Sequence, residues 1–111
     1  MAKTLQHQII EGALDILSEE KRWTRCSMAR NSEGQPCSVW DPGAVRFCAV
    51  GALWRSANDL MGTLDAFELV KAIAKRVVEI NSRTDCLQTL NDLEGHAAVV
   101  RMFRTSLEGG H

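Results

Sequence analysis

The sequence predicts an all-α fold, a compact bundle of four main helices and a short one, with an irregular or β-hairpin-like excursion at about residues 23–41. Apolar residues recur at helical spacing in long segments, and capping or helix-breaking residues separate those segments. Only residues 23–41 lack a helical stripe. A chain of 111 residues with 45% hydrophobic and 24% charged residues suits a single domain that spans residues 1–111.

The first helix is predicted over residues 4–20, with Thr4 as its N-cap. Its core-facing stripe follows the spacing of an amphipathic helix. The excursion comes next and holds turn residues at 31–34, so residues 26–29 and 37–39 could pair as a short hairpin. Tryptophans at both ends of the excursion indicate that it folds back onto the helices. The stripe of the first helix consists of Leu5, Ile9, Ala13, Ile16 and Leu17.

The central helix is predicted to begin at Asp41 and Pro42, since Asp is a good N-cap and Pro is favoured at the first helical position. From Phe47 to Trp54 it is apolar almost all round, which predicts burial on most sides. A stripe of small residues along one face would let another helix approach closely. That stripe consists of Ala44, Cys48, Gly51 and Ala52.

Gly62 is predicted to end the central helix, and a third helix to follow over residues 64–80. A short helical turn is expected near residues 86–90. Asn91 or Asp92 could then cap a last helix that runs to about residue 107.

The chemical properties of the whole chain favour the cytoplasm. The formal net charge of −1 gives no general attraction to nucleic acid, so we expect no nucleic-acid partner. No apolar run approaches the ~20 residues that span a bilayer, and the first residues lack a signal peptide's apolar core. In a reducing compartment we expect no disulfides among the four cysteines, Cys26, Cys37, Cys48 and Cys86.

Cys48 is the candidate nucleophile. A catalytic thiolate needs a helix N-terminus, a cation or a histidine base. A helix that begins at Pro42 would place Cys48 nearly two turns inside, among apolar neighbours, which favours a buried and inert thiol. The alternative is a thiol-dependent hydrolase or transferase in which His96 is the base and Asn91 or Asp92 orients it.

Metal and cofactor sites are not expected. The cysteine spacings match no zinc pattern, and no phosphate-binding loop is present. Asp92 and His96 lie four residues apart, so a weak metal site between them is geometrically conceivable. A ligand or partner surface could instead use tryptophans with nearby arginines. The candidates for that surface are Trp23, Trp40, Trp54, Arg46 and Arg55.

Several short motifs together resemble a small uncharacterised family of bacteria and their phages, a domain of unknown function. They are Arg22-Trp23, Ala29-Arg30, Gly34, the run from Ala44 to Leu53, Asn91-Asp92 and Gly95. The resemblance implies a compact helical domain in a cytoplasmic bacterial or phage setting, and it brings no activity. His96 is not among the features that carry it.

The sequence thus favours a small binding or protein-interaction module without catalysis. Its partner could be a protein, a small molecule or a second copy of the chain, and no membrane is expected. The thiol-dependent enzyme built on Cys48 remains the alternative.

Overall fold

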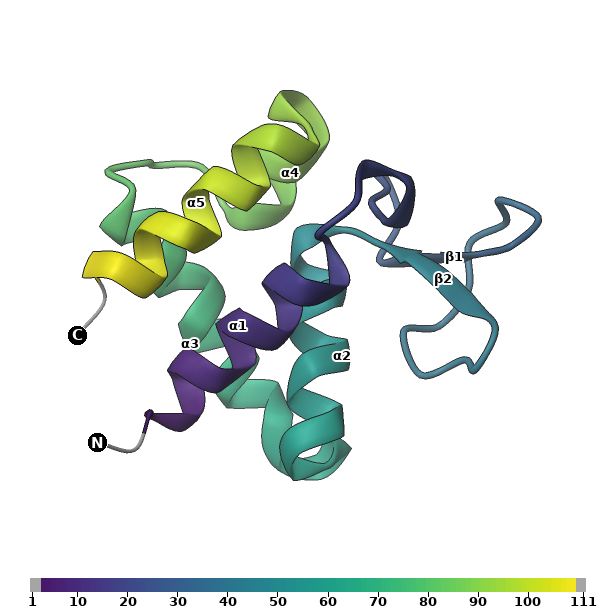
Figure 1. Ribbon diagram of the computed structural model, residues 1–111, viewed down its shortest axis with the longest axis horizontal. Coiled ribbons are helices and arrows are strands. Elements are labelled where there is room, and N and C mark those ends of the chain that lie inside the picture. The colour runs from purple at the N-terminus through teal and green to yellow at the C-terminus, as the bar shows by residue number, and fades with distance from the viewer. Residues whose placement is uncertain (1–2, 110–111) are drawn as a thin grey trace.

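The computed structural model describes residues 3–109, with the side chains of 63–65 and 109 left out, and is mostly helical (Figure 1). Five α-helices form one body of this described part, and a two-stranded antiparallel sheet projects from it. Four longer helices and a short one are confirmed, but the fold is mostly helical rather than all-α, because it includes the two-stranded sheet. The elements are α1 (Leu5–Ile16), a 3-10 turn η1 (Glu20–Arg22), β1 (Ala29–Asn31), β2 (Ala44–Phe47), α2 (Ala49–Met61), α3 (Thr63–Ile80), α4 (Leu87–Glu94) and α5 (His96–Gly109).

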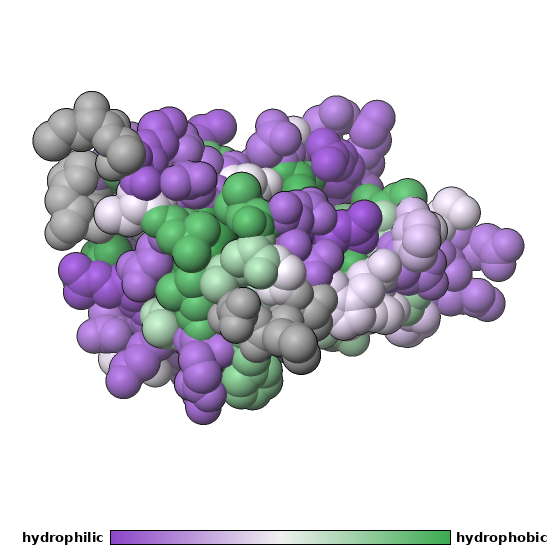
Figure 2. Space-filling view, turned by 90° about the horizontal axis from the view of Figure 1, so that it is seen from below, coloured by the Kyte–Doolittle hydropathy of each residue, from purple (hydrophilic) through white to green (hydrophobic). Residues whose placement is uncertain are grey.

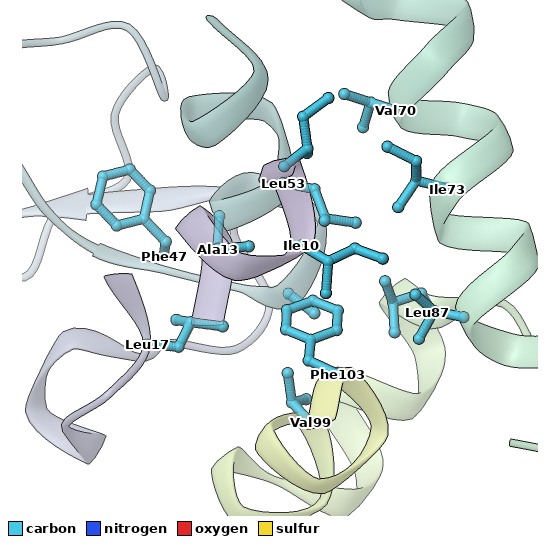
Figure 3. Packing of buried hydrophobic residues seen from close by; sticks show 14 of the residues in the cluster. Ile10, Ala13, Leu17, Phe47, Leu53, Val70, Ile73, Leu87, Val99 and Phe103 are labelled. Carbon is cyan, nitrogen blue, oxygen red and sulfur yellow. The ribbon is translucent and has the colours of Figure 1, made fainter. Parts of the chain in front are cut away.

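The core lies where α1 packs on α2 and α5, and where α2 packs on α3. Phe103 of α5 is fully buried at the centre of this packing, close to side chains of α1 and α4 (Figure 3). Burial of apolar side chains contributes roughly 25 cal/mol per Å² and is the main stabilising term of such a body. The large buried side chains of the core include Leu17, which follows α1, and Ile9, Leu53, Val70, Ile73, Val77, Leu87, Leu90, Val99 and Phe103 of the helices.

The central helix begins later than the sequence predicts. Asp41 and Pro42 belong to a turn instead, in which the Asp41 carboxylate accepts a hydrogen bond from the Gly43 N–H at 2.8 Å. Asp, Pro and Gly in consecutive turn positions are as typical of a β-turn as Asp-Pro is of a helix start. The following residues are extended as β2, and α2 begins only at Ala49 with Cys48 as its N-cap. The predicted small-residue stripe is therefore wrong, because Ala44 lies on a strand.

The sheet pairs different segments from those predicted. β1 pairs with β2, with Ala29 opposite Phe47 and Arg30 opposite Arg46. The predicted partner of β1, the segment near Cys37, makes a short bridge on the other side of β1, where the Cys37 N–H donates to the Ala29 carbonyl at 3.0 Å. The excursion thus extends to Phe47, beyond the predicted limit at residue 41.

The helix ends are set by glycines and caps. Thr4 caps α1 as predicted, since its hydroxyl accepts from the His7 N–H at 3.1 Å, although α1 ends at Ile16 rather than at residue 20. Gly95, with φ of +93°, separates α4 from α5. The predicted caps Asn91 and Asp92 are wrong, because both lie inside α4. None of the described helices has the length and hydropathy needed to cross a bilayer.

Candidate functional site

Asn91 joins three parts of the chain that are far apart in the sequence. Its Oδ1 accepts hydrogen bonds from the Trp23 Nε1–H at 2.7 Å and from the Ala49 N–H at 2.9 Å. Its Nδ2 donates to the Thr24 carbonyl at 3.1 Å. The side chain is fully buried, so these bonds form away from water. Asn91 therefore fixes α4 against both the start of α2 and the start of the excursion. We call this set of hydrogen bonds the Asn91 junction.

Asp92 extends this set of hydrogen bonds to Cys26, in the segment between η1 and β1. Its Oδ1 accepts from the Cys26 N–H at 2.9 Å and from the Asn91 amide at 3.0 Å. Burial alone raises the pKa of Asp92, but these hydrogen bonds and the one from Gln88 outweigh it and leave the pKa below its ordinary value. The carboxylate is thus ionised near neutral pH and holds a loop residue, Cys26, that has a positive φ of 62°.

Cys48 caps α2, a position usually taken by Ser, Thr, Asp or Asn. Its Sγ accepts from the Gly51 N–H at 3.2 Å, and its thiol donates to Gln88 Oε1 at 3.4 Å. Cys48 is fully buried, and burial raises its pKa despite the opposing hydrogen bonds from the N–H groups of Gly51 and Val50. The thiol is therefore protonated near neutral pH, although it lies at a helix N-terminus.

His96 lies at the first position of α5 and contacts a different segment. Its Nε2 is 2.6 Å from the Leu17 carbonyl, and its ring lies tilted at 6.3 Å from that of Trp23. A carbonyl oxygen only accepts, so Nε2 must carry a proton in this contact. Within residues 3–109 no hydrogen bond joins Cys48 to His96. The structure brings Asn91 and Asp92 close to the start of α2 and leaves His96 bonded to the end of α1.

The tryptophans and arginines proposed as a ligand surface are spread over several places. Trp40 packs edge-on against Trp54, with ring centroids 5.6 Å apart, whereas Trp23 is bonded to Asn91. Arg55 donates to the Val39 carbonyl at 2.8 Å and thereby holds the second half of the excursion, and Arg46 is exposed on β2. Of this group, Trp54 alone lines the pocket between α2, α3 and α4.

This pocket, which we call the α2–α3–α4 pocket, has a volume of about 560 Å³. The side chains of Val50, Val70 and Val78 make its walls apolar, and Trp54 and Phe67 add aromatic surface. Gln88 lines the pocket and also bonds to Cys48 and Asp92. These hydrogen bonds connect the pocket wall to the N-cap of α2 and to the carboxylate next to Asn91. Its charged or polar lining residues are Lys71, Lys75, Glu79, Arg83, Thr84, Asp85, Cys86 and Gln88.

Cys86, at the N-cap of α4, is the accessible thiol of this pocket. Its Sγ lies 3.1 Å from the Thr89 hydroxyl. That hydrogen bond and the Thr89 N–H lower the pKa of Cys86, with a smaller contribution from the Gln88 N–H, and together they outweigh the opposing effect of desolvation. A larger fraction of this thiol is therefore ionised near neutral pH than of an ordinary exposed cysteine.

Two further features of the surface bear on function. Among the described side chains, no three His, Cys, Asp or Glu residues cluster as metal ligands would. Figure 2 shows apolar side chains gathered on the face seen from below, which is bordered by hydrophilic ones. The large exposed apolar residues of the described helices are Leu5, Leu60, Phe67 and Leu93.

The fold and the pocket define a small, mostly helical protein with a two-stranded sheet and a mainly apolar pocket between α2, α3 and α4. A family of unknown function (DUF6197) matches residues 1–107, so the chain belongs to that family. No curated protein and no solved structure matches the chain. The resemblance found in the sequence is thus confirmed at the level of an uncharacterised family.

The pocket was not predicted from the sequence, because its lining residues come from α2, α3, α4 and the α3–α4 connection, which only the fold brings together. The lowered pKa of Cys86, however, could have been predicted. Cys86 precedes a short apolar helical turn, and a cysteine at a helix N-terminus has a lowered pKa.

Proposed function

We propose that this protein is a small non-catalytic binding module whose ligand or partner occupies the α2–α3–α4 pocket. The observation that carries the proposal is the pocket itself, because its volume of about 560 Å³ and its apolar walls are typical of ligand sites. Trp54 of the predicted ligand surface lies in this pocket. The proposed setting is the cytoplasm of a bacterium or phage-infected cell, which the resemblance implies and which suits four free cysteines.

The contacts of the remaining candidate residues support binding over catalysis. The thiol-dependent enzyme would need an ionised Cys48 with His96 as its base. Burial of Cys48 raises its pKa, and its thiol is bonded to Gln88. The hydrogen bonds of Asn91 and Asp92 hold the start of α2 and the segment from Thr24 to Cys26 in place. These residues are accounted for as structural elements, so the pocket is the better candidate for function.

A neutral apolar dye, N-phenyl-1-naphthylamine, tests this proposal through the rise of its fluorescence on binding. We expect saturable binding to the wild-type protein. The variant Ala74→Phe should weaken it at least about tenfold, because residue 74 lines the pocket and the new ring fills it.

The matched control is Ala72→Phe, the same change at an exposed position of α3 outside the pocket lining. It should leave dye binding unchanged. Thermal unfolding of both variants checks that the helix is intact. Absence of saturable binding to the wild type, or equal binding by the two folded variants, would contradict the proposal.

A further inference from the structure

The charges around the α2–α3–α4 pocket are separated along α3. Lys71 and Lys75, one turn apart, line the pocket from the middle of the helix, and Glu79 lines it one turn beyond Lys75, near the C-terminal end of the helix. The rise of 1.5 Å per residue places the levels of Lys71 and Glu79 about 12 Å apart. One end of the pocket is therefore cationic, and the other end carries a carboxylate.

The cations at the first end are free to meet a ligand. In the part of the chain that the structure describes, no hydrogen bond or ion pair reaches the ammonium group of Lys71 or Lys75. Arg83, the third cation of the lining, differs because its guanidinium makes a two-pronged ion pair with the Glu94 carboxylate. The positive charge left without a partner is thus concentrated at Lys71 and Lys75.

The other end of the pocket disfavours an anion. Glu79 and Asp85 both line it there, and the charge of Arg83 is already neutralised. Beside these charges the wall that α3 contributes is apolar, because Val70, Ala74 and Val78 recur every fourth residue on the same face of the helix. An occupant that matches this lining has an apolar body and one negative charge at the end near Lys71.

From this arrangement we infer that the ligand of the pocket is an amphipathic carboxylate, a single apolar chain or ring system with one carboxylate that meets Lys71 and Lys75. The inference rests on the proposed binding function and names the class of ligand. A small molecule fits the volume of about 560 Å³ in this open pocket. The lysines set the direction in which the ligand lies, and the apolar wall supplies most of the affinity.

Isothermal titration calorimetry with three ten-carbon probes tests the inference. Each probe is kept below the concentration at which it forms micelles. The probes are decanoate, decanol and decyltrimethylammonium, whose head groups are anionic, neutral and cationic in turn. Wild-type protein should bind decanoate roughly fivefold or more tightly than decanol, and decyltrimethylammonium most weakly. The variant Lys71→Gln/Lys75→Gln should bind decanol as before and lose the preference for decanoate.

The control variant is Arg76→Gln, which removes a cation at an exposed position beside Lys75 that does not line the pocket. It should keep the preference for decanoate. Equal binding of decanoate and decanol, or tightest binding of the cationic probe, would overturn the inference and leave the pocket as a binding site. Preference for decanoate that survives in the double lysine variant would also overturn it. No binding of any probe would instead count against the proposed function.

Discussion

Replacing Asn91 with alanine is expected to lower the free energy of unfolding by about 3 to 5 kcal/mol. The reason is that three groups lose their partner together, namely the Trp23 Nε1–H, the Ala49 N–H and the Thr24 carbonyl. A buried polar group without a partner costs about 1 to 3 kcal/mol, and Asn91 itself is fully buried. Urea unfolding followed by circular dichroism measures the loss.

Leu93→Ala is the matched control, since Leu93 lies in the same helix and is 74% exposed. This change should alter the free energy of unfolding by no more than about 0.5 kcal/mol. Because alanine is a better helix former than asparagine, helix propensity would make Asn91→Ala slightly stabilising. A loss of stability for Asn91→Ala no larger than that of the control would contradict the role assigned to the Asn91 junction.

The second large effect is expected for Gly51→Ala, at about 2 to 4 kcal/mol of lost stability. A Cβ at residue 51 would lie 2.0 Å from the Met28 carbonyl oxygen, so the loop backbone must move away from α2. At an exposed position in a helix, the same change raises the free energy of unfolding by about 1 kcal/mol. A fall in this free energy for Gly51→Ala therefore indicates that the close packing of the backbone requires glycine, and a rise indicates that it does not.

Gly12 provides the comparison, because a Cβ there would meet a side-chain atom, the Ser56 Oγ, at 2.1 Å. Gly12→Ala should destabilise the protein, and Ser56→Ala added to it should restore much of the loss. At residue 51 no such rescue is expected from Met28→Ala, since the obstructing atom is a backbone oxygen. A Gly51→Ala protein as stable as the wild type would show that α2 does not need the close approach.

The helices were the predictable part of this fold because their signals are local. The Thr4 cap and the break at Gly62 can be predicted from a few neighbouring residues. The stripe of the first helix is confirmed at Ile9, Ala13 and Leu17, which are buried, but not at Leu5, which is exposed. The start of α2 was not predictable in that way. Asp41-Pro42 fits both a helix start and a turn. Only the pairing of the following residues with β1, in which Ala44 lies opposite Asn31, decides between them.

The candidate site was predictable in parts. Cys48, Gly51 and Asn91 stand out in the sequence, and the structure unites them around the start of α2. Their roles depend on partners distant in the chain, Met28 for Gly51 and Trp23 for Asn91, which no local pattern reveals. The small size of Gly51 was read correctly as a sign of close packing, but its neighbour is a loop backbone and not a second helix.

The central claim is that Cys48 is a buried structural cap and not a nucleophile. The accessible thiol is Cys86, which lines the proposed binding pocket between α2, α3 and α4. Alkylation of the native protein by iodoacetamide, read at each cysteine by mass spectrometry across neutral and mildly alkaline pH, tests this claim most directly. Cys86 should react readily, and its rate should level off at a lower pH than that of an ordinary thiol, because its pKa is lowered. Cys48 should react only as the protein unfolds, since it is fully buried and its pKa is raised. Fast labelling of Cys48 in the folded protein near neutral pH would contradict the claim and favour the thiol-dependent enzyme.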